Sequence, residues 1–197
     1  MGEDPIRFMN YGYAPAGDAD RINLSTSDED DRAHIQLYHS VAGAIDLRDL
    51  RVMEMSCGRG GGASYVSRYL KPRLVVGVDR TQGALQFARR HHGNGPLGFV
   101  CGDAMSFPFG ASSFDAVVSV EASHCYPDFA GFLVEVRRVL RPGGLFLYTD
   151  FRDADECDAW HEQIAASGLP VQQEEDITGH VVRGLELNEK RTQALIR

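Results

Sequence analysis

Acidic side chains and a histidine stand at the ends of several short apolar runs in this sequence. Carboxylates accept hydrogen bonds from hydroxyl and ammonium groups, and an imidazole can take up a proton near neutral pH. If the apolar runs are parallel strands, their carboxyl ends meet at one edge of a sheet, where such groups could bind a small molecule and act on it. The residues concerned are Glu54 within "VMEMSCGRGGGA" (52–63), Asp79 after "LVVGV", Glu121 and His124 after "FDAVVSV", and Asp150 after "LFLYT".

A glycine cluster follows Glu54, so the backbone can approach a ligand closely there. A glycine turn between a strand and a helix presents free N–H groups. A phosphate-binding P-loop is excluded, because it needs a lysine in this turn and the chain has none between residues 1 and 70. Gly58, Gly60 and Ala63 match the letters of the dinucleotide motif G-x-G-x-x-A, which keeps an NAD-dependent oxidoreductase as an alternative.

S-adenosylmethionine (SAM) is the third ligand class that such a loop can hold. An acid in the first strand, here Glu54, can approach the ammonium end of SAM, and Ser56 and the glycines can lie along its ribose and methionine portion. An unpaired buried carboxylate costs several kcal/mol, so a ligand explains Glu54 better than packing does. A side chain that points to solvent at the strand end is the alternative.

Later segments separate SAM from NAD. Asp79 can accept hydrogen bonds from both ribose hydroxyls of either ligand. The segment "GDAMSFPF" (102–109) lies where an adenine is expected, with Asp103 able to accept from its exocyclic amine, and NAD folds do not require this segment. The predicted cofactor-binding residues are Glu54, Ser56, Gly58, Gly60, Asp79, Arg80, Gly102, Asp103, Ala104 and Glu121.

Apolar periodicity predicts the elements that position these residues. It predicts strands at 51–55, 74–78, 97–100, 114–120 and 144–149, a weak strand at 169–175, and helices at 25–45, 61–70, 81–91, 128–140, 153–166 and 178–196. Strands that alternate with helices form a parallel sheet covered on both faces. We therefore expect an α/β fold with a three-layer, doubly wound, mainly parallel sheet, in one domain over 25–197 with its core at 51–150.

The motifs of residues 51–150, in their order, resemble those of class I SAM-dependent methyltransferases. "DRAHIQLYH", "SCGRGGGASY", "VEASHCYPDF" and "VLRPGG" are similar to segments of the phthiotriol/phenolphthiotriol dimycocerosate methyltransferases and related bacterial natural-product O-methyltransferases. The resemblance implies SAM as methyl donor, S-adenosylhomocysteine as product, and a hydroxyl on a small lipidic or polyketide-like molecule as acceptor. It also implies a Rossmann-like sheet that ends in an antiparallel hairpin. Because no last strand is readable, we expect six strands or fewer, with the C-terminal strand or strands missing.

His124 is the predicted general base for a hydroxyl acceptor. Methyl transfer is an in-line displacement that needs the acceptor aligned and its proton removed, and it requires no metal. Asp150 ends the adjacent strand and could orient the imidazole, in an arrangement similar to the His/Asp pairs of related O-methyltransferases. Helix capping is the alternative role, for His124 at the helix that follows it and for Asp150 as an N-cap.

The first 24 residues predict a flexible N-terminal arm, since they are rich in Gly, Pro and Asp. Related enzymes place an aromatic N-terminal segment over the cofactor, so Tyr11 and Tyr13 are candidate lid residues. An ordinary surface arm is the alternative. Phe151 and Trp160 are expected to pack rather than to bind.

Composition narrows the choice of partners. The 197 residues carry a net charge of −8, which argues against nucleic acid and anionic membranes as partners. The lack of a long apolar run predicts no stable membrane anchoring. Four cysteines without a C-x-x-C pair predict a reduced, cytoplasmic protein with no zinc site. The expected partner is a small-molecule acceptor, and a homo-oligomer is compatible with the sequence. The remaining alternative is a SAM- or S-adenosylhomocysteine-binding protein of the same fold, acting as a cyclase or without catalysis.

Overall fold

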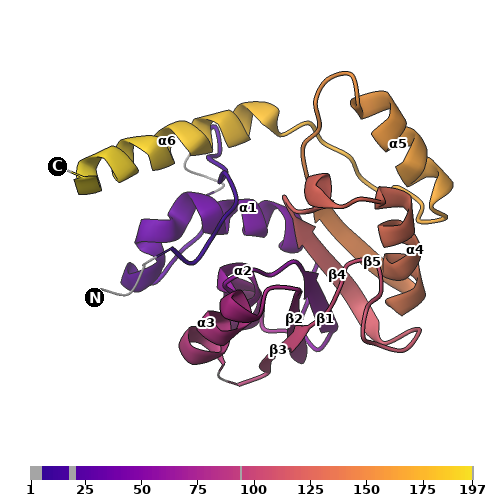
Figure 1. Cartoon of the computed structure of the whole chain (residues 1–197). Helices are drawn as coiled ribbons and strands as arrows, with labels where there is room; N and C mark the ends of the chain where they lie inside the picture. Colours follow the sequence, from indigo (N-terminus) through magenta and orange to yellow (C-terminus); the bar gives the residue numbers. More distant parts are fainter. Residues whose placement is uncertain (1–5, 18–20, 94, 197) are drawn as a thin grey trace.

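The protein folds around one parallel sheet, as the computed structural model shows for residues 6–17, 21–93 and 95–196 (Figure 1). The sheet has five strands in the order β3-β2-β1-β4-β5. The strands are β1 (Arg51–Met55), β2 (Leu74–Asp79), β3 (Leu97–Cys101), β4 (Phe114–Val120) and β5 (Leu140–Thr149). This confirms the predicted doubly wound α/β sheet, and the count of strands in the described residues stays within the expected six.

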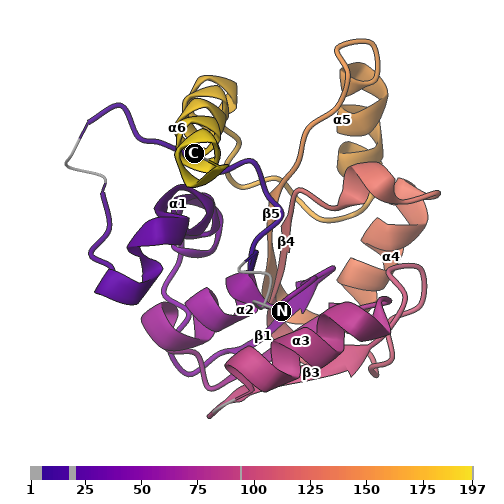
Figure 2. The same ribbon diagram turned by 60° about the vertical axis from the view of Figure 1, so that its left-hand side comes forward.

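Helices cover both faces of this sheet (Figures 1 and 2). One apolar cluster joins the sheet to α1 (Arg32–Ala42), α2 (Gly61–Tyr65) and α3 (Gln82–His92), and a second joins it to α4 (Phe129–Val139). The remaining elements are α5 (Cys157–Ala166) beside α4, α6 (Thr178–Ile196) beside α1, and the short segments η2 (Thr26–Asp31), η3 (Val66–Leu70) and η4 (Ser123–Cys125). Within the described residues, no helix has the length and apolar character needed to cross a bilayer.

The sheet register brings the predicted site residues to one edge. β1 and β4 are buried on both faces, which explains their nearly continuous apolar sequences. β4 pairs with β5 through Val120 and Thr149, the last residue of each strand. The segments that follow these two strands therefore start side by side, and this places His124 next to Asp150.

Several sequence-based boundaries differ from the structure, among them the helix expected at 61–70, which divides into α2 and η3. β5 begins at Leu140 rather than 144, because Leu140 pairs with Phe114 before a register shift. The expected helix at 25–45 divides into η2 and α1, and the one at 153–166 begins only at Cys157. The weak strand at 169–175 was wrong: this segment forms no strand and is almost wholly exposed. Pro170 cannot donate to a strand partner, and the residues after Val171 are polar, so no apolar face favours pairing.

The N-terminal arm lies between α1 and α6 (Figure 2). The Tyr13 amide donates to the Ala33 carbonyl of α1 at 2.9 Å, and the Ala14 amide donates to the His180 carbonyl of α6 at 3.0 Å. The backbones touch at Gly184, where a Cβ atom would lie only 2.6 Å from the carbonyl carbon of Gly12. Glycine at 184 therefore allows α6 to hold the arm against the domain.

We expect Gly184→Ala to loosen the arm, because its methyl group would meet backbone that no rotamer change can move. Such overpacking costs about 1–3 kcal/mol, and trypsin should cut after Arg7 faster in this variant. Limited proteolysis followed by mass spectrometry measures the rate. The matched control is Gly179→Ala on the same helix, where a Cβ atom meets open space. Equal protection of the arm in both variants would contradict the role of Gly184.

Candidate active site

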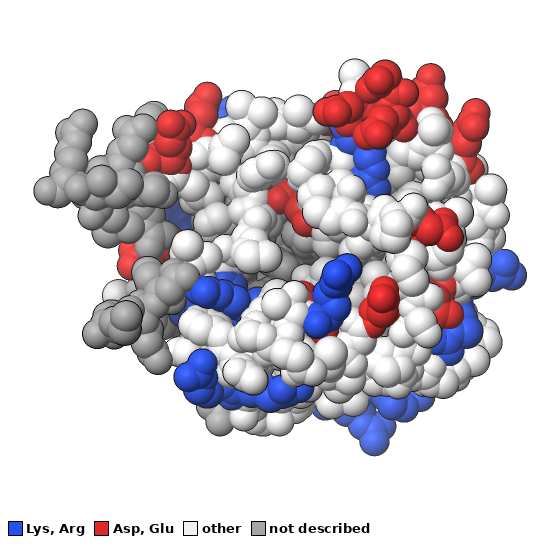
Figure 3. Space-filling model, viewed as in Figure 1, with Lys and Arg blue, Asp and Glu red and all other residues white. Residues whose placement is uncertain are grey.

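A cavity of about 220 Å³ lies at the carboxyl ends of β1 and β4, and the corresponding face of the molecule is hollowed near its centre (Figure 3). Its walls come from the arm, the glycine loop, α1, α2 and the ends of β4 and β5. Of the predicted site residues it brings together Tyr11, Ser56, Gly58, Glu121 and His124. Among the described residues, no group of three or more His, Cys, Asp or Glu side chains could hold a metal ion.

The glycine loop turns sharply between β1 and α2. Ser56, Gly58 and Gly60 all have positive φ angles, of 56°, 52° and 81°, a conformation that glycine adopts freely and serine only with strain. At Gly62, a Cβ atom would lie 2.0 Å from the ring of Tyr38. Larger residues could therefore not keep the loop this close to α1 and the cavity.

Glu54 lies just behind the cavity wall and is only 1% exposed. The Tyr38 hydroxyl donates to its Oε1 atom at 2.6 Å, whereas Oε2 has no hydrogen-bond partner. Burial raises the pKa of Glu54 to about 8, although the Tyr38 hydroxyl and the nearby Ala63 amide oppose this shift. The Ala63 N–H lies close enough to lower the pKa of Glu54, but Oε2 makes no hydrogen bond of ordinary length and angle. The solvent-facing alternative for Glu54 is thus wrong, and its free oxygen suits a cationic ligand group.

Asp79 is buried at the end of β2 and organises the glycine loop. Its Oδ2 atom accepts from the Gly58 amide at 2.9 Å and its Oδ1 atom from the Thr81 amide at 2.8 Å. Asp79 does not line the cavity, so its predicted contact with ribose hydroxyls stays a prediction.

The residues predicted to surround the adenine also lie outside this cavity. Asp103 is exposed and accepts from the Met105 amide at 2.9 Å, which stabilises its own turn. Ala104 is buried in the apolar cluster that includes α4. Arg80 is exposed, and neither Arg80 nor Gly102 lines the cavity. Their roles, and that of Gly60, stay predictions.

Glu121 connects the arm to the end of β4. Its Oε2 atom accepts from the Tyr11 amide at 2.7 Å. Burial, reinforced by the charge of Asp150, raises the pKa of Glu121 to about 7, against the opposing effects of the Tyr11 amide and His124. Its φ angle of 47° is in the left-handed region, so the backbone is strained here as it is at Ser56.

Aromatic rings continue from the arm to the histidine. The Tyr11 ring lies 5.3 Å from that of Phe151, and Phe151 lies 4.3 Å from the imidazole of His124, measured between centroids. Phe151 thus lines the cavity, whereas the sequence favoured a packing role alone. Tyr13 instead stacks on His180 of α6 at 4.7 Å and does not line the cavity.

His124 and Asp150 form a direct pair at the ends of β4 and β5. The imidazole Nδ1 lies 2.8 Å from Oδ1 of Asp150, whose side chain is 0% exposed. The carboxylate also accepts from the amides of Ser123, His124 and Phe151 and from the Ser123 hydroxyl. An oxygen pair with this many donors suits the ionised carboxylate, so Nδ1 carries the proton and Nε2 is left as an acceptor.

The helix-capping alternatives are wrong for both residues. Asp128 caps α4, since its side chain accepts from the Gly131 amide, and the N-cap position of α5 is Glu156. His124 and Asp150 are therefore held by each other and by the neighbouring loops.

Sequence reasoning missed two partners in this site. Tyr38 showed only helical apolar spacing, which gave no sign that its hydroxyl would reach Glu54. Tyr126 follows η4, and its hydroxyl lies 2.6 Å from Ser56 Oγ, which links the glycine loop to the β4 side. Both contacts join distant parts of the chain, so no local pattern could reveal them.

The fold is that of class I methyltransferases. The solved structure of the cyclase SpnF has a TM-score of 0.73 at 22% identity, covering 92% of this chain and 73% of that chain. The YcgJ protein from Bacillus subtilis has a TM-score of 0.62 at 23% identity, covering 80% of each chain. At these identities the two structures show the fold alone.

The family follows from sequence comparison. A model of the methyltransferase domain matches residues 53–148. The phthiotriol/phenolphthiotriol dimycocerosates methyltransferase 1 of Mycobacterium ulcerans is 44% identical, covering 100% of this chain and 72% of its own. The fatty-acid O-methyltransferase of Mycolicibacterium smegmatis is 46% identical, covering 95% and 68%. The chain belongs to this family of SAM-dependent methyltransferases, which are enzymes of the EC 2.1.1 type. The resemblance read from the sequence is therefore confirmed. The comparisons do not favour the NAD-dependent oxidoreductase or the cyclase alternative.

The raised pKa of Glu54 predicts how stability depends on pH. The pKa of Glu54 in the folded protein, about 8, exceeds the ordinary value of 4.5 that it has in the unfolded chain. The protonated carboxyl therefore contributes its full stability below pH 4.5, and this contribution is lost as the pH rises through the folded-state pKa. We expect the melting temperature of the ligand-free protein to fall across this range, and Glu54→Gln to flatten the fall. The upper limit of the effect is about 5 kcal/mol.

Thermal melts at several pH values measure this slope. The control is Glu135→Gln. The Arg138 guanidinium lowers the pKa of Glu135 in the folded protein, so Glu135 is ionised in both the folded and the unfolded protein once the pH is well above 4.5. Glu121, raised to about 7, adds a second fall in the same direction that remains in the Glu54 variant. A slope that Glu54→Gln leaves unchanged would rule out a buried neutral carboxyl.

Proposed function

We propose that this methyltransferase O-methylates a hydroxyl on a small lipidic or polyketide-like acceptor, with His124 as general base. The observation that carries the proposal is the His124–Asp150 pair, whose imidazole lines the cavity while a buried carboxylate holds its Nδ1 atom. Nε2 is then available to take the hydroxyl proton as the oxygen attacks, a contribution worth about 10²–10⁴-fold in rate.

The residues around the glycine loop fit SAM as the methyl donor. The unpaired Oε2 atom of Glu54 suits an ammonium group, and the positive φ angles at Gly58 and Gly60 allow close approach of backbone N–H groups. Asp79, Arg80, Gly102, Asp103 and Ala104 are proposed for the ribose and adenine side. When bound, SAM supplies a methyl group already activated by its sulfonium.

The rim of the cavity suits a lipidic acceptor. Three of the residues lining it are large, apolar and well exposed: Met9 at 77%, Tyr11 at 45% and Phe151 at 40%. Exposed apolar groups that gather at a cavity mark a binding surface. The names of the relatives, which specify dimycocerosates and fatty acids, support the same class of acceptor and a role in natural-product biosynthesis.

During the reaction, the protein's own groups hold a proton and exclude water. Asp150 keeps the imidazole in the tautomer that accepts at Nε2, and its charge stabilises the imidazolium that forms. Tyr11 and Phe151 close the side of the cavity next to His124, and the arm that carries Tyr11 is proposed as the lid. The four cysteines are free thiols, which suits the reducing, cytoplasmic setting that we propose, and a homo-oligomer is compatible with it.

Cofactor binding gives the first test of this proposal. S-adenosylhomocysteine should raise the melting temperature, and Asp79→Ala should weaken its binding by about ten- to hundred-fold, as expected for a lost charge-assisted hydrogen bond. Calorimetric titration measures the affinity. Asp46→Ala is the control, since Asp46 is exposed and pairs with nearby Arg48. Stabilisation by NAD but not by S-adenosylhomocysteine would reject the proposed site.

The role of His124 is tested with two acceptors, a long-chain alcohol and the matching fatty acid, and mass spectrometry of the products for the gain of one methyl group. We expect His124→Ala to lower turnover with the alcohol by about 10²–10⁴-fold while S-adenosylhomocysteine binding changes little. Asp150→Asn should cost less, because the base itself remains.

The fatty acid acts as an internal comparison, because a carboxylate acceptor is already deprotonated and needs no base. His161→Ala is the control for loss of an imidazole, since His161 lies on α5 and pairs with Glu174, away from the cavity. Normal turnover of the alcohol by His124→Ala would contradict the base. Methylation of the fatty acid alone would contradict a hydroxyl acceptor.

A further inference from the structure

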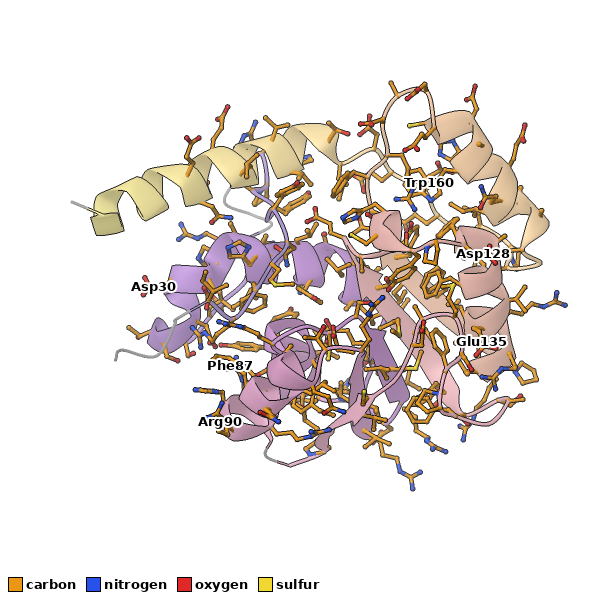
Figure 4. All side chains as sticks on the ribbon, in the orientation of Figure 1. Asp30, Phe87, Arg90, Asp128, Glu135 and Trp160 are labelled. Carbon is orange, nitrogen blue, oxygen red and sulfur yellow. The ribbon has the colours of Figure 1, made fainter. Side chains whose placement is uncertain are left out.

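A cluster of buried polar groups lies directly behind the His124 imidazole. The Arg152 side chain is only 10% exposed, and its guanidinium carbon lies 5.2 Å from the ring centroid of Phe129 and 5.0 Å from that of Trp160. Trp160 projects from α5 toward the body of the molecule (Figure 4). Two aromatic rings thus lie against the guanidinium, an arrangement that cation–π attraction favours.

The hydrogen bonds in this cluster have a single consistent direction. The Trp160 indole N–H can only donate, and it meets the Tyr148 hydroxyl at 3.2 Å. The Ser123 hydroxyl has one proton and lies 2.6 Å from the carboxylate of Asp150, which only accepts. The Tyr148 hydroxyl, 2.6 Å from Ser123, must therefore donate to it. Burial raises the pKa of Tyr148, so its proton stays in place.

Arg152 adds a second line of contact to the same carboxylate. Its Nη2 donates to Ser123 Oγ at 2.9 Å, and its Nη1 donates to the Phe151 carbonyl at 2.6 Å and lies 3.6 Å from Asp150 Oδ1. Among the described residues, no other Arg or Lys forms an ion pair with Asp150. A cation this close offsets part of the cost of burying the carboxylate.

We propose that Arg152 is a positioning residue for methyl transfer. Acting through Asp150 and Ser123, it fixes the orientation of the His124 imidazole and limits how strongly that imidazole binds a second proton. The kinetic part of this inference rests on the proposed function of His124 as base. The electrostatic link between Arg152 and His124 does not, and it can be measured without turnover.

The sign of the effect follows from the charges around the imidazole. Without the positive charge of Arg152, the negative charge of Asp150 acts on the imidazole uncompensated, so His124 should bind a proton at higher pH. The Arg152 Nη1 and the His124 Nδ1 lie 3.6 Å and 2.8 Å from the same carboxylate oxygen, and a charge within about 4–6 Å of a titrating group shifts its titration by about one pH unit or more. Of the other charged groups, Glu121 after β4 interacts electrostatically with His124, and Arg7 and Arg59 line the same cavity from the arm and the glycine loop.

The experiment is an NMR titration of the histidine ring signals in the ligand-free full chain, with His124→Ala used to assign the His124 signal. Arg152→Met keeps a long side chain against the two rings without charge, and we expect it to raise the titration midpoint of His124 by about one pH unit. Arg152→Lys keeps the charge and should return the midpoint to its original value. The acidic limb of the kcat/KM profile should move with the midpoint.

Arg141→Gln is the matched control, because Arg141 lies at the opposite end of β5 and pairs with Asp115. An unchanged midpoint in Arg152→Met overturns the proposal, as does a midpoint in Arg152→Lys that moves as far as in Arg152→Met. Loss of the fold in both Arg152→Met and Arg152→Gln overturns it too, since Arg152 would then be structural only. A shifted midpoint combined with normal turnover of His124→Ala supports the link and rejects the base.

Discussion

Four neighbouring strands of this sheet end in or beside a carboxylate, and the surrounding segments must supply hydrogen-bond donors to these carboxylates. A buried carboxylate is stable only where donors or a cation meet it. The donors are the Tyr38 hydroxyl for Glu54, the Gly58 and Thr81 amides for Asp79, the Tyr11 amide for Glu121, and the Ser123, His124 and Phe151 N–H groups for Asp150. Most of these donors line the cavity or adjoin it. The stability of this edge and its capacity for chemistry therefore have one origin.

The same constraint explains how a distant segment becomes a wall of the site. Glu121 and Tyr11 are 110 positions apart. The backbone of Tyr11 is held from both sides, because its carbonyl accepts from the side-chain amide of Asn188 on α6 at 3.1 Å. Removing either contact would leave a polar group without its partner. The arm therefore crosses the cavity, with α1 and α6 holding the residues that follow Tyr11.

The sequence predicts the sheet well because strands buried on both faces leave a strong local pattern, as in β1 and β4. It also brings His124 and Asp150 together, since both follow neighbouring strands of a parallel sheet. It fails at 169–175, where Leu169 and Val171 are the only apolar side chains apart from Pro170 and the predicted weak strand does not form. It also gives no sign of Arg152, because the value of that residue depends on two rings from α4 and α5. Local patterns therefore predict which groups reach the edge, but the tertiary fold decides which of them meet.

The two sides of the cavity differ in how completely their polar groups are satisfied. Asp150 has hydrogen bonds to both oxygens and gains nothing from a ligand, so it can keep an imidazole fixed through a reaction. Glu54 has an oxygen without a partner, and Ser56 and Glu121 hold strained backbone angles. Burial raises the pKa of Glu54 to about 8 and that of Glu121 to about 7, so a cationic group bound beside them would favour their ionised forms. Binding can therefore recover free energy at Glu54, Ser56 and Glu121 that folding leaves unsatisfied, while the His124–Asp150 pair is already complete before any ligand arrives.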